Sequence, residues 1–286
     1  MTIGIWVLGD QLNAAQTALA AFRPGDVPVL LIESRSVLER HAFHQQKLVL
    51  VWSAMRHFAA ELAQAGWTVD QRQADSFSAA LGAWVGQRGI EELHLMEPAD
   101  RPFRLAIDRA VAHLAAERPL RLVWHPSNAF LWSRDDFAAW AGRYKQLRLE
   151  FFYREGRRRF GVLMDQSEPL GGQWNYDHDN RKAPPKGLQG PPPLCFEPDP
   201  ITEAVIERVE VLAAERSAAG LPPLPGLARP FHWAVSREQA LQVLEHFIAT
   251  RLDGFGPYQD AMVSGQRSEE HTSELQSHSD LVCRLL

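Results

Sequence analysis

The chain has 286 residues, which is enough for one large domain or two domains of ordinary size. Its hydrophobic content of 45% and charged content of 23% are typical of a globular protein with a substantial core, and two cysteines exclude a disulfide framework. The net charge of −5 excludes a global attraction to nucleic acid, so such binding needs a local basic patch. No apolar run approaches the roughly 20 residues that cross a membrane, and a secretory signal pattern is absent; we expect a cytoplasmic protein without membrane partners.

The first 125 residues alternate between short apolar runs and helical patterns. Continuous apolar runs of strand length are typical of strands buried on both faces of a parallel sheet. The helical patterns between them cover 36–66, which closes at Gly66, and then 77–85 and 102–116. This alternation predicts a Rossmann-like, doubly wound parallel α/β sheet. The predicted strands are IGIWVL (3–8), PVLLIE (28–33), the weaker WTVDQR (67–72), ELHLME (92–97) and LRLVWH (120–125).

The pattern changes after residue 125. Ser133 and Asp136 have the spacing of a capping box and predict a helix over 133–144. A basic, aromatic segment follows, and then a stretch (183–200) that is too rich in proline for a regular element. Helical patterns resume at 201–216 and 236–252. We therefore expect the α/β sheet to be followed by a linker and the incomplete start of an all-α domain.

Polar residues follow the first two predicted strands. Asp10 and Gln11 come directly after the first strand, and Glu33 ends the second. Ligands of doubly wound sheets bind beyond the carboxyl ends of the strands, so these side chains are candidates for a pocket. The glycine-rich loop of ordinary dinucleotide-binding proteins is absent. The alternative for Asp10 is a structural role as the cap of a turn.

The predicted helix over 36–66 carries several histidines and cations. His41 and His44 share a helix face, as a pair of metal ligands would, but no third ligand is evident. Solvated or core histidines are the preferred interpretation. Arg56 and His57 lie near Trp52 on this helix. They could reach a ligand, although helical spacing alone does not show it.

A basic stripe occupies 153–159, with phenylalanines on either side. Cations beside aromatic rings favour a nucleic-acid surface, and a cationic helix face that pairs with acidic residues is the alternative. The segment 171–182 reads as a functional loop, in which Asp177 and Asp179 could hold Mg²⁺ through water or merely form turns. P-loop, HExxH and CxxC patterns are absent, so we assign no catalytic or metal-binding residue.

Five stretches together resemble the iron–sulfur bacterial cryptochromes and photolyases, also called deoxyribodipyrimidine photolyase-related proteins. The resemblance covers residues 1 to about 266, with Gly156 standing where the family pattern usually has methionine. Glycine costs roughly 1 kcal/mol in a helix interior, so this position is expected to loosen the helix locally. The stretches are LGDQL (8–12), SAMRHFAAEL (53–62), FFYREGRRRFGVLMD (151–165), GGQWNYDHDNRK (171–182) and FGPYQDAM (255–262).

The resemblance implies a light-dependent flavoprotein that acts, as a monomer, on damaged DNA. It repairs UV pyrimidine lesions, with the (6-4) type favoured, or senses blue light. An N-terminal antenna domain would bind a ribityllumazine, and a helical domain would hold FAD and a four-cysteine iron–sulfur cluster. The residues that match the antenna pocket are Asp10, Gln11, Glu33, His44 and Lys47. Those that match the DNA-contacting segment are Arg154, Arg157, Arg158, Gln173, Trp174, Asn175 and Arg181.

The same resemblance predicts the domain boundaries. We expect an antenna domain at 1–130, an interdomain segment at 131–200, the beginning of the helical FAD-binding domain at 201–266, and an unrelated tail at 267–286. The FAD and cluster residues of relatives lie beyond the match at 255–262, and neither Cys195 nor Cys283 corresponds to a cluster ligand. The chain alone is therefore expected to be inactive.

The tail RSEEHTSELQSHSDLVCRLL (267–286) is expected to be an artefact. Back-translation matches a common sequencing adapter, which encodes RSEEHTSELQS, then a variable index and LVCRLL. We therefore expect the natural coding sequence to have been cut after Gln266. A natural amphipathic or disordered tail is the alternative.

Two other classes of function stay open. One is a stand-alone chromophore-binding module without catalysis. The other is a nucleotide-binding α/β protein, similar to electron-transfer flavoprotein domains, whose resemblance to photolyases is ancestral.

Overall fold

A computed structural model describes residues 1–40, 42–180, 182–183, 185–188 and 190–258. These form two compact units, each of which is described by itself. Unit 1 comprises 1–127 and 192–246, and unit 2 comprises 128–191 together with 247–258. The predicted tail at 267–286, and with it the expected artefact, lies outside the described residues.

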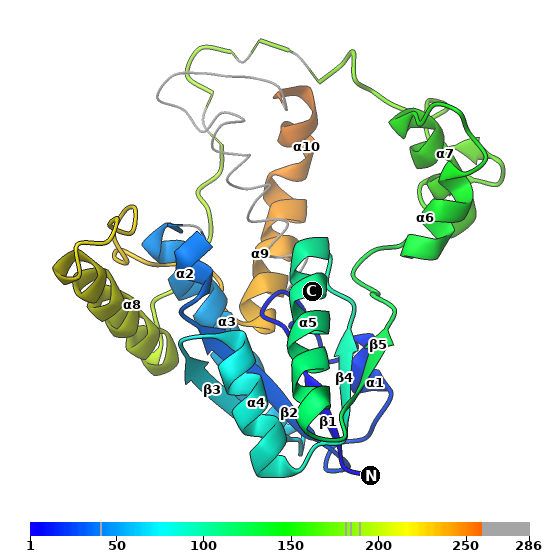
Figure 1. The fold of residues 1–286 in the computed structure, drawn as a ribbon. Helices are drawn as coiled ribbons and strands as arrows, with labels where there is room; N and C mark the ends of the chain where they lie inside the picture. Colours follow the sequence, from blue (N-terminus) through cyan, green and yellow to red (C-terminus); the bar gives the residue numbers. More distant parts are fainter. Residues whose placement is uncertain (41, 181, 184, 189, 259–286) are drawn as a thin grey trace. The chain divides into compact units, whose positions relative to one another are not determined.

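Unit 1 is built on a five-stranded parallel sheet, as predicted (Figure 1). Its spatial order is β3-β2-β1-β4-β5, so the chain runs outward from β1 in both directions. The carboxyl ends of β1 and β4 thus flank the point where the strand order reverses, which is where doubly wound sheets bind ligands. The strands are β1 (Ile3–Trp6), β2 (Pro28–Ser34), β3 (Thr68–Ala74), β4 (Glu92–Met96) and β5 (Arg121–His125).

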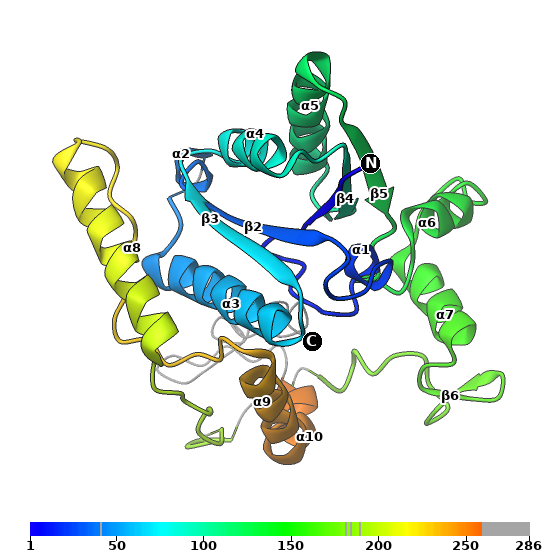
Figure 2. The ribbon, with the colours of Figure 1, turned by 90° about the horizontal axis from the view of Figure 1, so that it is seen from below.

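Helices cover both faces of this sheet (Figure 2). The short α1 (Thr17–Ala20) and the long α3 (Gln45–Gln64) pack on one face with Ile5 of β1. On the other face, α4 (Phe77–Arg88) and α5 (Arg101–Glu117) pack with Trp6. Successive side chains of a strand point to opposite faces, which is why neighbouring residues of β1 belong to different cores. The double covering explains why most of the strands are continuously apolar.

The predicted helix over 36–66 is divided in the structure. A short α2 (Val37–Arg40) is followed by a break, and α3 then begins at Gln45. His44 is the N-cap of α3, because its Nδ1 accepts a hydrogen bond from the backbone N–H of Gln46 at 3.2 Å. Gly66, predicted to close the helix, follows the C-cap with φ of +91°.

The segment after the proline-rich stretch packs into unit 1. Helix α8 (Pro200–Ala218) lies against α3 and buries Val205, Ile206 and Val209 in the same core. Its N-cap Asp199 lies 3.2 Å from His57 Nε2 of α3. Helix α9 (Arg237–Thr250) follows it. Residues 192–246 thus belong to unit 1, so the assignment of 201–266 to a flavin-binding domain stays a prediction.

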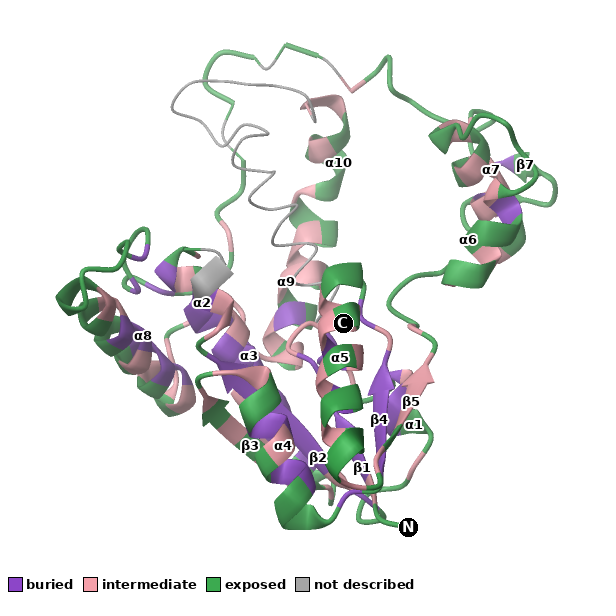
Figure 3. Cartoon of the chain, viewed as in Figure 1, coloured by how far each residue is buried: buried purple, intermediate pink, exposed green. Residues whose placement is uncertain are grey.

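Unit 2 contains short elements with an aromatic core. The predicted capping box is present: Ser133 Oγ accepts from the Asp136 N–H at 3.0 Å. Many of its side chains are partly or fully exposed (Figure 3). The elements of unit 2 are α6 (Arg134–Ala141), α7 (Leu149–Phe160), the hairpin of β6 (Met164–Asp165) and β7 (Glu168–Pro169), α10 (Leu252–Phe255) and the 3-10 turn η1 (Gly256–Tyr258).

Within the described ranges of the chain, no helix combines the length and the apolar composition of a membrane span.

Candidate functional site

Unit 1 has a cavity of about 600 Å³ beside the carboxyl ends of β1 and β2, between α3, α4 and α5. Three rings make one wall: Trp6 lies 5.9 Å from Phe77 and 6.5 Å from Phe103, between ring centroids. Phe77 and Phe103 are 5.2 Å apart. Met55 and Val51 of α3 add further apolar surface. A cavity of this size with mostly apolar walls is typical of a site for one small organic ligand.

A few polar groups also line this cavity. Asp10 and Lys47 are among them, and the hydroxyls of Ser34 and Ser36 lie 2.8 Å apart. Ser76 is the N-cap of α4 and accepts from the Ala79 N–H at 3.2 Å. The N-cap of α5, Asp100, lines the cavity as well, so two helix N-termini are directed at it. The arrangement can orient a ligand that has a flat apolar part and several polar groups.

Gln11 is not among the residues that line the cavity. Its side chain is buried, and Nε2 donates to the carbonyl oxygens of Met96 at 3.0 Å and Glu97 at 3.2 Å. These bonds tie the segment after β1 to the end of β4 at the strand-order reversal. Its Oε1 is buried without a hydrogen-bond partner among the described residues.

Glu33 lies on the opposite face of β2 from the cavity. Its carboxylate accepts from Arg56 Nε at 2.8 Å and Nη2 at 2.9 Å, and from Gln71 Nε2 at 2.9 Å. The hydrogen bonds with Glu33 raise the pKa of Arg56, although burial acts to lower it. Its neighbour Ser34 points into the cavity instead. The alternation of side chains along β2 could have shown that Ser34, and not Glu33, faces the cavity, because Ile32 and Ser34 point to the same face of the sheet.

His44 and Lys47 lie at the start of α3, where both are exposed. Lys47 lines the cavity, with its Nζ 4.5 Å from the centre of the Phe43 ring. His44 does not line it. Its ring lies against Gly226, where φ is +66° and any Cβ would overlap the imidazole. The possible metal partner His41 lies outside the described residues.

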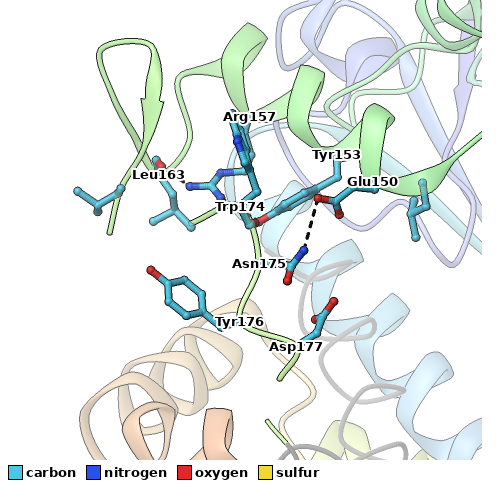
Figure 4. Close-up of a pocket in the computed structure, with 10 residues that line it drawn as sticks. Glu150, Tyr153, Arg157, Leu163, Trp174, Asn175, Tyr176 and Asp177 are labelled. Atoms are coloured by element: carbon cyan, nitrogen blue, oxygen red, sulfur yellow. Dashed lines mark hydrogen bonds between the residues drawn. The ribbon is translucent and has the colours of Figure 1, made fainter. Parts of the chain in front are cut away.

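Unit 2 has a second hollow of about 570 Å³, beneath α7 (Figure 4). On the helix side, Glu150 and Tyr153 line it, and Asn175 and Asp177 come from the loop after the hairpin. Asn175 Nδ2 donates to Glu150 Oε1 at 3.4 Å, which joins the two sides. The remaining lining residues are Leu149, Arg157, Leu163, Leu170, Trp174 and Tyr176.

Arg157 holds the backbone around this hollow together. Although it is an arginine it is buried, and it donates to the carbonyl oxygens of Val162 at 3.2 Å, Trp174 at 3.3 Å and Leu163. It also donates to the Tyr153 hydroxyl at 3.3 Å. Its donors are therefore engaged within unit 2, and the geometry gives it a structural role beside the predicted role at DNA.

The other arginines of α7 surround the Trp174 ring. Arg158 lies 4.4 Å from the ring centre and Arg154 lies 5.3 Å from it. Arg154 forms an ion pair with Glu150 at 2.6 Å. Arg158 is exposed and has no ion pair with the described residues, so it is the arginine of this group best placed to meet a phosphate. Outside the predicted set, Arg159 pairs with Asp136 at 2.7 Å.

The rest of the predicted loop residues are placed as follows. Gln173 is exposed, and Arg181 lies outside the described residues. Of the two possible magnesium ligands, Asp179 lies 3.2 Å from His178 Nε2, whereas Asp177 lines the hollow. The described part of the chain has no group of three or more potential metal ligands.

The parallel sheet with helices on both faces and a cavity at the strand ends defines a doubly wound α/β domain. The family model for deoxyribodipyrimidine photo-lyase-related proteins matches residues 5–219. The chain belongs to this family. A (6-4) photolyase of Agrobacterium fabrum is 33% identical over 275 residues, which cover 94% of this chain and 52% of that photolyase. The chain thus spans about half the length of that relative.

Two further likenesses are weaker. An uncharacterised protein of Acanthamoeba polyphaga mimivirus is 23% identical over 151 residues, covering 51% of this chain and 75% of the viral protein. The crystal structure of a class III photolyase from Agrobacterium tumefaciens is 16% identical, with a TM-score of 0.45, over 91% of this chain and 47% of that structure.

Proposed function

We propose that this chain is the N-terminal part of a light-dependent, flavin-containing DNA photolyase or cryptochrome-like photoreceptor. Its own task in that protein is to hold an antenna chromophore in the cavity of unit 1. The observation that carries the proposal is a ligand-sized, ring-walled cavity beside the carboxyl ends of β1 and β2, in a chain that belongs to the photolyase-related family.

The residues of the cavity fit a ribityllumazine. The Trp6, Phe77 and Phe103 rings suit a flat heterocycle, and the Ser34 and Ser36 hydroxyls suit a sugar-alcohol chain. When bound, such a chromophore absorbs near-UV or blue light and passes the excitation on. Asp10 and Lys47 are proposed to bind its polar groups, and Gln11 to position the segment that carries Asp10.

A second task, contact with damaged DNA, is proposed for unit 2. It is supported by the arginines that surround Trp174 on α7, of which Arg158 is exposed. Lesion repair, the (6-4) preference, FAD and the iron–sulfur cluster are proposed for the whole protein, which is proposed to act as a monomer.

A stand-alone nucleotide-binding module is the alternative, and one observation favours it. The N-termini of α4 and α5 both meet the cavity, and helix N-termini favour anionic groups such as phosphate. A nucleotide that bound this cavity more tightly than a ribityllumazine would select the alternative.

The substitution Asp10→Ala tests the proposed antenna site. We expect weaker binding of ribityllumazine to the purified chain, because a polar contact in the cavity is lost, by about tenfold for a hydrogen bond to a charged group. Fluorescence titration measures it, with Asp75→Ala as the control, since Asp75 is an exposed carboxylate that does not line the cavity. Unchanged affinity in Asp10→Ala would remove Asp10 from the site.

A further inference from the structure

The cavity of unit 1 carries more negative than positive charge. Among the described residues that line it, the charged side chains are those of Asp10, Asp100 and Lys47. Two carboxylates therefore stand against one ammonium group. The rest of the polar lining consists of hydroxyl groups, which belong to Ser34, Ser36, Ser76 and Ser78. A lining of this kind matches a ligand with hydroxyl groups better than one with phosphates.

Asp100 lies at the N-terminus of α5 but does not cap it with its side chain. A residue at this position usually accepts a hydrogen bond from a backbone N–H of the first helical turn. The Asp100 carboxylate makes no such bond, although its backbone is extended as in an N-cap. Helix α4 differs, because Ser76 Oγ accepts from the Ala79 N–H at 3.2 Å. The carboxylate of Asp100 is thus not committed to its own helix, and it lines the cavity.

This carboxylate changes what the end of α5 can bind. The N-terminus of a helix favours anions, and phosphate groups commonly bind there. With Asp100 beside the cavity, that end already carries a negative charge. A phosphate monoester has a charge of about −1.5 to −2 at pH 7 and would meet a like charge. A hydroxyl group can instead donate a hydrogen bond to the carboxylate, which only accepts when it is ionised.

Lys47 does not reverse this preference. It is exposed at the start of α3, and its Nζ lies 4.5 Å from the centre of the Phe43 ring. One ammonium group can offset only one of the two carboxylates. A phosphate group of a ligand would therefore still face a negative charge that is not compensated by the described lining.

We propose that Asp100 makes the cavity selective for chromophores with free hydroxyl groups over their phosphate esters. Its carboxylate accepts from a hydroxyl group of the sugar-alcohol chain and repels a phosphate. Selectivity of this kind depends on rejecting the wrong ligand as well as on binding the right one. The inference rests on the antenna site proposed above and names the group that decides which chromophores the site accepts. It also disfavours the nucleotide alternative, because nucleotides carry phosphates.

The test compares ribityllumazine with its 5′-phosphate ester, which differ by one phosphate group. Fluorescence titration of the 286-residue chain measures the dissociation constant of each ligand. We expect the ester to bind about tenfold more weakly, because its phosphate meets a like charge. Salt screens such repulsion, so the difference should narrow as the ionic strength rises from about 0.01 M to about 1 M. Exclusion of the ester by size alone would not depend on salt.

Variants assign the selectivity to Asp100. Asp100→Asn keeps the size of the side chain, an acceptor oxygen and a residue type that suits an N-cap, but removes the charge. We expect this variant to bind the ester about tenfold more tightly than the wild type does, with little change for ribityllumazine. Glu117→Gln is the matched control, because it removes an exposed carboxylate at the other end of α5, outside the cavity lining. It should leave the ratio of the two dissociation constants unchanged.

The outcomes separate the selectivity from the antenna site on which it rests. If the chain binds the two ligands equally, the antenna site stands and the selectivity is wrong. An unchanged ratio in Asp100→Asn would also overturn the inference, because another group would then be selecting. If the chain binds neither ligand, both the antenna site and the selectivity are wrong. The wild-type ratio and its salt dependence decide between these results even if Asp100→Asn fails to fold.

Discussion

At the scale of single residues, Glu33 is the clearest case of a side chain whose surroundings assign it to stability. It is buried and held by Arg56 and Gln71, on the sheet face away from the cavity. Removing one member of a buried ion pair leaves the other charge without compensation. We expect Glu33→Ala to lower the free energy of unfolding by about 3 kcal/mol. Urea denaturation of the chromophore-free chain measures this, with the exposed Glu91→Ala as control; equal values for the two variants would contradict the structural role.

Gly4 of β1 is a second position where one atom matters. A Cβ at this position would overlap the Trp84 ring and lie 3.0 Å from Ile90 Cδ1. The ring cannot move easily, because Trp84 is fully buried and its Nε1 donates to Asp70 at 2.8 Å. We expect Gly4→Ala to cost about 1–3 kcal/mol of stability, as overpacked cores do. Thermal unfolding checks the direction, and a melting temperature equal to that of the wild type would refute the packing.

At the scale of elements, β4 and β5 are joined by a histidine pair. His94 Nδ1 lies 2.7 Å from His125 Nε2, and His94 Nε2 lies 2.7 Å from Glu92. Burial, and then the neighbouring His94, lower the pKa of His125 below its ordinary value of 6.5. The unfolded chain therefore takes up this proton more readily than the folded chain does. It follows that stability falls as the pH drops below about 6.5.

A substitution isolates this pH dependence. Between about pH 7.5 and pH 5.5, His125→Asn should flatten the fall in the free energy of unfolding, whose limit for one proton is about 1.4 kcal/mol per pH unit. Urea denaturation across this range measures the slope. His113→Asn, on the exposed side of α5, should leave the slope unchanged. Equal slopes for the wild type and His125→Asn would mean that protonation of His125 does not contribute to the pH dependence of the free energy of unfolding.

The elements also differ in how far the residues alone could predict them. The strands and the capping box at Ser133 were predictable, because continuous apolar runs and Ser-x-x-Asp spacing act locally. The break before α3 was missed, because a histidine is an unusual N-cap and the apolar periodicity continues through it. The hollow in unit 2 could not be predicted, since it depends on Arg157 meeting carbonyl groups of a distant loop.

The candidate site residues also divide into those that the local sequence indicates and those that depend on contacts between distant segments. Asp10 and Lys47 line the cavity. Asp10 was expected near a pocket from its place after β1, whereas Lys47 was expected only from the family resemblance, and the binding role of both stays a prediction. Ser34 and Ser36 were missed, although the alternation along β2 already separated Ser34 from Glu33. That Glu150 of α7 and Asp177 of the following loop line one hollow becomes visible only in the structure, because the two segments are separated in the sequence.

At the scale of the whole molecule, we propose that the antenna chromophore binds in unit 1 and that FAD and the iron–sulfur cluster bind outside it. The central claim is that the cavity between α3, α4 and α5 holds the chromophore. The side chain of Ala106 on α5 lines this cavity, whereas Ala112 on the same helix is exposed. A phenylalanine at position 106 would therefore fill the space that the chromophore needs, and one at position 112 would not.

The most direct measurement is a spectroscopic titration of the purified chain with ribityllumazine and, separately, with FAD. We predict one bound lumazine per chain, loss of that binding in Ala106→Phe, normal binding in Ala112→Phe, and no stoichiometric FAD. Lumazine bound equally well by Ala106→Phe, or a chain loaded with FAD that repairs lesions under blue light, would contradict the account.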